Sequence, residues 1–123
     1  MSKNTTRSLD YMRDLGFSVW MVERFLRFPP PGRRVDLYNC IDFLAINEIS
    51  TVGVQSCGSG FADHKKKILE CEHTVSWLEC VDRELMLIGW RKLKLKRGGK
   101  AMRWRPRIAH FEILDGKVVC KEG

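Results

Sequence analysis

The sequence lacks any long apolar segment. Its longest apolar runs, such as residues 41–46, which Asp42 interrupts, are far shorter than the roughly 20 residues that a membrane-spanning helix needs. The first residues, MSKNTTRS, are polar and do not form the apolar part of a secretory signal. We therefore expect a protein with no membrane partner that works in the cytoplasm.

Paired cysteine spacings are also missing. The chain has five cysteines, an odd number, at positions 40, 57, 71, 80 and 120. In a reducing compartment such residues are more often small buried hydrophobes than disulfide partners. No cysteine and histidine follow the paired spacing of a zinc module, and nothing fixes a base beside a cysteine nucleophile. The sequence therefore argues against zinc and thiol chemistry.

Acidic residues are absent where basic residues gather. Lys and Arg total 22 against 15 Asp and Glu, which gives a formal net charge of +7. Residues 91–107 contain nine basic residues and no acidic one. Such a segment favours a polyanionic partner and salt-sensitive association. A protein whose positive charge has no function would not be expected to gather its basic residues in one segment.

The length and the apolar periodicity predict one α/β domain over residues 1–123. Leu9, Met12 and Leu15 recur at helical spacing before Gly16. Three prolines predict an exposed loop over 28–34, and Gly98-Gly99 predicts a hairpin. We expect helices over 5–16, 61–71 and 74–80, and strands over 17–23, 35–46, 51–55, 84–90, 102–108 and 117–120.

Alternation in residues 102–108 places Arg103, Arg105 and Arg107 on one face of a strand, with Trp104 and Ile108 on the other. Pro106 favours an edge position, because proline cannot donate to a ladder. Together with lysines on the opposite strand of the hairpin, these arginines predict a continuous positive surface. The predicted nucleic-acid-binding residues are Arg33, Arg34, Lys65, Lys92, Lys94, Arg103, Arg105 and Arg107.

The order helix, three strands, helix, strand resembles the core of the PD-(D/E)XK nuclease superfamily. Residues 35–46 resemble its second strand, in which an acid precedes an apolar run, and Asp42 takes that position. Residues 51–57 resemble its third strand, residues 58–68 the following loop and helix, and residues 88–92 and 103–105 the closing hairpin of small Holliday-junction-resolvase-like relatives, including phage-encoded ones.

This resemblance implies a restriction-endonuclease-like core (αβββαβ), a mixed central sheet flanked by helices with a C-terminal basic β-hairpin. It also implies action on DNA as a homodimer, in the host cytoplasm if a phage encodes the chain. The implied cofactor is Mg²⁺ or Mn²⁺, because phosphodiester hydrolysis needs a cation to activate water and offset charge. Asp42, the amide oxygen of Gln55 and the carbonyl of Ser56 would be its ligands, and Glu23 or, alternatively, Asp10 would position water.

The third motif departs from the family, because Gln55-Ser56-Cys57 replaces Glu-x-Lys. Gln55 brings no negative charge, and Cys57 cannot replace an ammonium group. Lys65 or Lys66 of the following helix would substitute for the missing lysine. The catalytic prediction therefore comprises Glu23, Asp42, Gln55, Lys65 and Lys66.

Each of these features also has a structural explanation. Asp42 would cap backbone donors, Gln55 would make a structural hydrogen bond, and Glu23 would pair with a nearby arginine. The lysine run would be a solvated helix face, and the four tryptophans would be core residues. The sequence predicts a metal-dependent DNA endonuclease, with a catalytically inactive DNA-binding module on the same fold as the alternative. A basic interaction protein that does not bind DNA is a third hypothesis.

Overall fold

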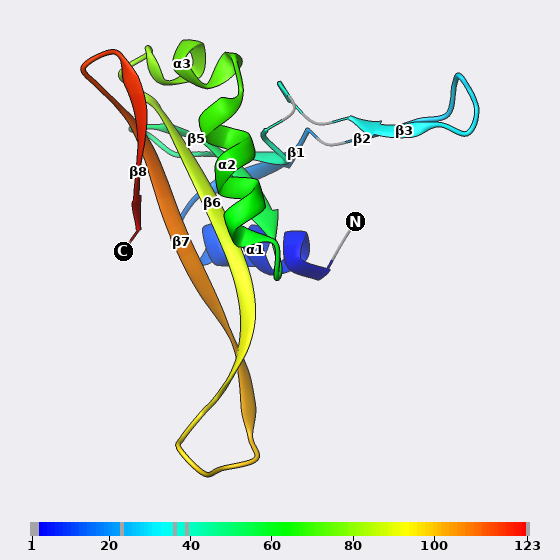
Figure 1. Cartoon of the computed structure of the whole chain (residues 1–123), viewed down its shortest axis with the longest axis vertical. Coiled ribbons are helices and arrows are strands. Elements are labelled where there is room, and N and C mark those ends of the chain that lie inside the picture. The colour runs from blue at the N-terminus through cyan, green and yellow to red at the C-terminus, as the bar shows by residue number, and fades with distance from the viewer. Residues whose placement is uncertain (1–2, 23, 36, 39, 123) are drawn as a thin grey trace.

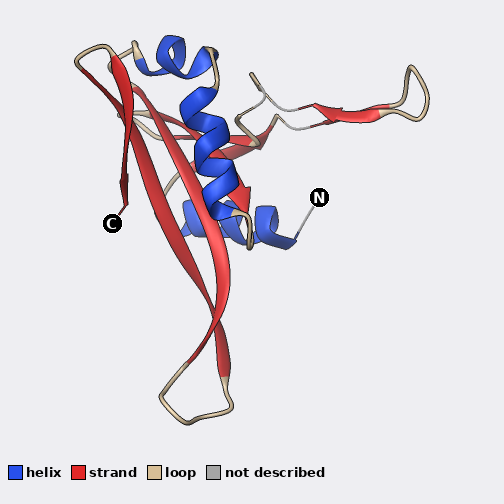
Figure 2. Ribbon diagram, viewed as in Figure 1, coloured by secondary structure: helices blue, strands red, loops and turns tan. Residues whose placement is uncertain are grey.

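A mixed six-stranded sheet with helices on both faces organises the chain (Figures 1 and 2). The computed structural model describes residues 3–22, 24–35, 37–38 and 40–122. Its elements are α1 (Lys3–Asp14), β1 (Ser18–Met21), β2 (Arg24–Leu26), β3 (Arg33–Val35), β4 (Phe43–Ile46), β5 (Thr51–Cys57), α2 (Phe61–Glu70), α3 (His73–Leu78), β6 (Arg83–Lys94), β7 (Met102–Leu114) and β8 (Lys117–Glu122).

The strand order in the main sheet is β1-β4-β5-β6-β7-β8, and β2 pairs with β3 in a separate hairpin. Neighbouring strands are antiparallel except β5 and β6, which are parallel. A parallel pair needs a crossover, and α2 and α3 provide it. The predicted α/β class and mixed sheet are confirmed. Within the described ranges, no helix is long and apolar enough to cross a membrane.

Two apolar layers cover the two faces of the sheet. On one face, Leu9 and Met12 of α1 pack with a cluster that includes Phe43, Val54 and Ile88. The second layer includes these residues of α2, α3 and the sheet: Phe61, Ile68, Trp77, Leu85 and Leu87. All residues of β5 after Thr51 are buried, as expected for a strand covered on both sides.

The segment predicted as one strand over 35–46 is irregular in its middle. Tyr38 has a positive φ of 56°, the N–H of Cys40 donates to the carbonyl of Leu37, and Leu37 forms an isolated bridge with Ile41. This turn confines the strand to Phe43–Ile46. The predicted loop over 28–34 is also too long, since Arg33 begins β3.

The strands β6 and β7 are longer than predicted and extend beyond the sheet. The pairing of β6 with β5 ends at Gly89, and the pairing of β7 with β8 reaches only to Ala109. Beyond these points residues 90–94 pair only with residues 102–106, and residues 95–101 form the tip. We call residues 90–106 the arm; Figure 2 shows this hairpin projecting from the body. Pro106 therefore lies at an edge of β7, as predicted.

Gly89 allows α2 to approach the sheet closely. A Cβ atom at this position would lie 2.4 Å from Cδ2 of Phe61 and 3.4 Å from Sγ of Cys57. We expect Gly89→Ala to lower the free energy of unfolding by about 1–3 kcal/mol, because the buried ring must move. Urea unfolding measures this difference. Gly60→Ala is the matched control, since its Cβ would meet His64 no closer than 3.4 Å; equal losses in both variants would contradict the close approach.

Candidate nucleic-acid interface

Asp42 lies just before β4 and is 7% exposed. Its N–H donates to the carbonyl of Val54 over 2.8 Å, and its Oδ2 accepts a hydrogen bond of 2.9 Å from the N–H of Ser56. The β4–β5 ladder ends at Phe43 and Val54. The carboxylate therefore accepts a hydrogen bond from β5 just past Phe43, where the β4–β5 ladder ends. This is the expectation that Asp42 caps backbone donors.

Gln55 is 1% exposed, and both ends of its amide bind protein groups. Its Nε2 donates to the carbonyl of Cys40 over 3.0 Å, so Oε1 faces Nδ1 of His64 at 2.8 Å. Nδ1 of His64 then carries the proton. Burial, followed by the charge of Lys67, lowers the pKa of His64, so the ring stays neutral at neutral pH. A metal ion at Gln55 would have to compete with these contacts.

Ser56 connects β5 to α1 and β6. Its hydroxyl donates to the carbonyl of Asn4 over 2.9 Å and lies 2.6 Å from the hydroxyl of Ser8. The indole N–H of Trp90 donates to the same Ser8 hydroxyl over 2.8 Å. Asp42, Gln55 and Ser56 thus lie at one end of β5, with the Gln55 amide on the side of α2 and the Ser56 hydroxyl on the side of α1, and each has partners within the protein. In the part of the chain that the structure describes, no group of three His, Cys, Asp or Glu residues could hold a metal ion.

Cys57, at the position where the resemblance would require a lysine, is buried. Burial, and secondly the carboxylate of Asp42, raise the pKa of this thiol from 9.0 to about 11, although the charge of Arg107 opposes the shift. Cys57 is therefore a neutral thiol at neutral pH. It supplies neither the charge of an ammonium group nor a reactive thiolate.

The face of α2 that meets the sheet carries Phe61, His64 and Ile68. Lys66 is exposed and lies 4.0 Å from Glu70. Burial raises the pKa of the Cys120 thiol in β8, and the nearby charge of Lys65 opposes that shift. His64 is the α2 side chain that bonds to Gln55. Sequence reasoning missed His64, although its spacing of three residues from Phe61 and four from Ile68 would have placed it on the inner face.

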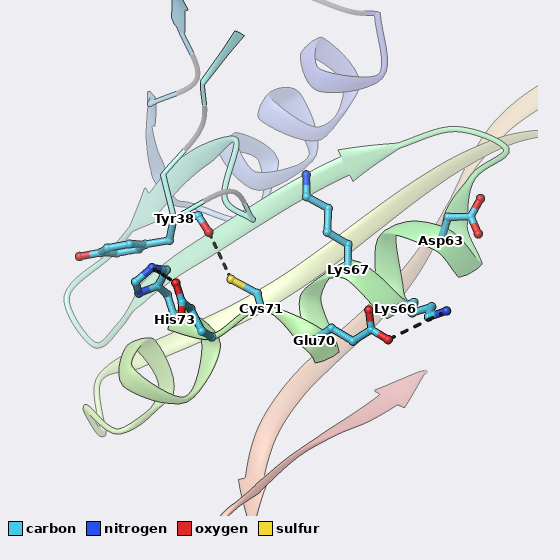
Figure 3. Close-up of a pocket in the computed structure, with 8 residues that line it drawn as sticks. Tyr38, Asp63, Lys66, Lys67, Glu70, Cys71 and His73 are labelled. Carbon is cyan, nitrogen blue, oxygen red and sulfur yellow. Dashed lines mark hydrogen bonds and ion pairs between the residues drawn. The ribbon is translucent and has the colours of Figure 1, made fainter. Parts of the chain in front are cut away.

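An open groove runs along α2 and reaches the start of α3 (Figure 3). Its lining mixes acids with lysines and includes Tyr38, whose ring lies 5.0 Å from that of His73. Cys71 Sγ donates to the Tyr38 carbonyl over 3.2 Å. The acidic side chains Asp63, Glu70 and Glu72 offset the nearby lysines, so this groove is a poor site for a polyanion.

The arm carries basic residues on both of its faces. Arg105 pairs with Arg91, Arg103 with Leu93, and Arg107, just beyond the arm, with Gly89, so these four arginines share one face. We call Arg91, Arg103, Arg105 and Arg107 the arginine face. Lys92 and Lys94 pair with Trp104 and Met102 and lie on the opposite face. The predicted alternation of Arg103, Arg105 and Arg107 with Trp104 is confirmed, and the continuous surface that would join them to Lys92 and Lys94 is wrong.

The arginine face contains like charges directly opposite each other. Arg91 and Arg105 are cross-strand partners, an arrangement that destabilises an isolated ribbon. Arg107 is neutralised by Glu122, whose Oε1 accepts from its Nε over 2.9 Å and lies 2.8 Å from its Nη2, and its guanidinium lies 4.0 Å from the ring centre of Phe61. Over the described ranges, no carboxylate pairs with Arg91, Arg103 or Arg105. Three guanidinium groups therefore remain available to an external anion.

Trp104 joins the arm to α1. The guanidinium of Arg7 lies 3.7 Å from its ring centre, Lys92 Nζ lies 6.0 Å from it, and Nη1 of Arg7 also donates to Asn4 over 2.8 Å. The ring is 41% exposed, and Trp20 is exposed as well. The prediction that all four tryptophans are core residues is correct only for Trp77 and Trp90.

Several predicted site residues lie away from this surface. Arg33 is an exposed residue of β3, in the hairpin formed by β2 and β3, and Arg34 follows it in the same strand. Glu23 lies outside the described residues. Asp10, the alternative acid, is exposed on α1 and pairs with Arg13 at 3.2 Å; unlike the others, it lines a hollow beside Trp90 and Trp104 at the base of the arm.

The raised pKa of Cys57 predicts a pH-dependent contribution to stability. The folded state holds this proton more tightly than the unfolded chain, so the contribution is full below pH 9 and is lost as pH rises from 9 to about 11. A shift of this size corresponds to about 2–3 kcal/mol. We expect the difference in unfolding free energy between the parent protein and Cys57→Ala to shrink over this range in urea titrations. The exposed Cys80→Ala is the control, and an unchanged difference would contradict the assignment.

The chain was also compared with protein-family models, with curated proteins and with solved structures, and none of them matches. The function of this chain therefore has to be inferred from its own contacts, burial and charge.

Proposed function

We propose that the protein binds DNA through the arm, as a binding module without cleavage activity. The observation that carries this proposal is the Arg91–Arg105 cross-strand pair, which lies beside Arg103 with no neutralising carboxylate among the described residues. Like charges held opposite each other cost stability in the free protein. A phosphate backbone would remove that cost, so the arrangement is better suited to a complex with a polyanion than to a free surface.

The choice of arginine supports a phosphate partner. A guanidinium presents several donors in a planar fork and binds phosphate through two parallel hydrogen bonds. The other basic residues of the arm, Lys92, Lys94, Lys96, Arg97 and Lys100, add charge along its length and at its tip. A protein that neutralises several phosphates binds in a strongly salt-dependent way.

The contacts at the end of β5 support a module without cleavage activity. Asp42 binds the N–H of Ser56, and the amide of Gln55 is bonded at both ends. Cys57 in place of lysine is a neutral thiol. These contacts satisfy the groups that a catalytic cation would otherwise use, and they favour the inactive alternative on the same type of core.

A metal-dependent endonuclease of the PD-(D/E)XK type is the second candidate. It is favoured by the order of elements, in which α1, the strands β1, β4 and β5, a helical crossover and the parallel strand β6 follow one another as the resemblance implies. Asp42, Gln55 and Ser56 also gather at one end of β5, where Mg²⁺ or Mn²⁺ would bind. In this candidate a homodimer would act on structured DNA in the cytoplasm.

The binding proposal predicts a change in salt dependence. Removing two phosphate contacts with Arg103→Ser/Arg105→Ser should lower the slope of log affinity against log salt concentration by about 2 units. Fluorescence anisotropy with a labelled DNA, at several salt concentrations, measures the slope. Lys117→Ser/Lys121→Ser removes the same formal charge from β8, away from the arm, and should change the slope less. Equal slopes in the two variants would refute a role of the arginine face.

The two candidates differ in their response to metal. The binding module should not cut linear, nicked or four-way-junction DNA with Mn²⁺, and isothermal titration should detect no Mg²⁺ binding. Cleavage that stops with a chelator and with Asp42→Ala would establish the nuclease instead. Since Asp42→Ala also leaves the buried N–H of Ser56 without its acceptor, at a cost of about 1–3 kcal/mol, its folding must be verified by circular dichroism. Sedimentation in the presence and absence of DNA tests the dimer.

A further inference from the structure

We propose that the arm enters the major groove of double-stranded B-form DNA, so that both of its faces contact phosphates. This inference rests on the proposed DNA binding and adds the kind of nucleic acid and the way in which it is held. Five residues on each strand, 90–94 and 102–106, form a ribbon with no third strand beside it. At about 3.3 Å per residue the paired part is roughly 17 Å long.

The distribution of charge favours a surrounded arm over one that lies flat on DNA. Arg91, Arg103 and Arg105 lie on one face, and Lys92 and Lys94 lie on the other. If one face lay flat on a phosphate backbone, the other face would point into solvent. A groove has a phosphate backbone along each wall, so a ribbon within it can use both faces at once. The major groove of B-form DNA, about 12 Å wide, admits a two-stranded ribbon.

The side chains of the arm do not suit single-stranded nucleic acid. Proteins that bind single strands stack bases on exposed aromatic rings. The arm has two aromatic residues, Trp90 and Trp104. Trp90 is buried and bonded to Ser8, and Arg7 covers Trp104 at 3.7 Å from its ring centre. Trp90 offers no platform for an unpaired base, and Arg7 already occupies one face of Trp104, so the arm lacks the row of free rings that single-strand binding uses.

Double-stranded RNA fits less well than DNA. The major groove of an A-form helix is deep and narrow, and side chains cannot read it. An arm that needs access to two phosphate walls from within a groove therefore requires the wider groove of B-form DNA. The expected order of affinity is DNA duplex, then RNA duplex and single-stranded DNA.

The test compares variants of the two faces. Arg103→Ser/Arg105→Ser and Lys92→Ser/Lys94→Ser each remove two positive charges from exposed positions of the arm. On a DNA duplex of about two helical turns, both variants should lose affinity by at least about tenfold and lower the salt slope by about 2 units. A loss confined to the Arg103→Ser/Arg105→Ser variant would mean that the arm lies flat, and would overturn the inference.

Three further measurements with the parent protein complete the test. Methyl green, which occupies the major groove, should compete with the protein, and netropsin, which occupies the minor groove, should not; the reverse result overturns the inference. Equal affinity for single-stranded DNA or for an RNA duplex also overturns it, while salt-dependent binding to DNA would still support the proposed function. Failure to bind any of these nucleic acids at low salt would remove the proposed function itself.

Discussion

The parallel pairing of β5 with β6 is the constraint on which the rest of the structure depends. It requires the helical crossover that covers one face of the sheet, and it places both strands at the centre, where they are buried on two sides. The pairing ends at Cys57 and Gly89, but β6 continues for five residues. The same strand thus contributes to the core in its first half and to the arm in its second half.

This arrangement separates two groups of polar residues that the sequence presents as one site. At the end of β5, carboxylate, amide and hydroxyl groups satisfy one another or nearby backbone groups, as in the contact between Asp42 and Ser56. Along the arm, guanidinium groups face one another without acids. The first group therefore maintains the junction of α1, β4, β5 and α2, whereas the second keeps an electrostatic cost that a bound polyanion would relieve.

The sequence predicted the features that depend on local periodicity. The helices over α1 and α2, the alternation of Arg103 with Trp104, and the hairpin at Gly98-Gly99 all follow from spacing between near neighbours. Features that depend on residues far apart in the sequence were harder to predict. The lysines of β6 lie opposite the arginine face because seven residues separate Lys94 from Met102, and this register cannot be read from either strand alone.

The site was harder to predict than the fold for a related reason. Asp42 has the position expected of a ligand, but its acceptor role depends on where β4 begins, which the turn at Tyr38 determines. The contact between His64 and Gln55 joins a helix to a strand, and no sequence motif predicts it. In contrast, the arginine face could be anticipated, because one strand alone supplies three of its four members.

The contact of Arg7 with Trp104 has a consequence for mechanics. A two-stranded ribbon on its own is only marginally stable, but this one is held near its base by Arg7 of α1. This helix is bonded to β5 and β6 through Asn4, Ser8 and Ser56. The base of the arm is therefore held in a fixed position relative to the sheet. Any macromolecule that binds to the arm would adopt a defined orientation relative to the sheet.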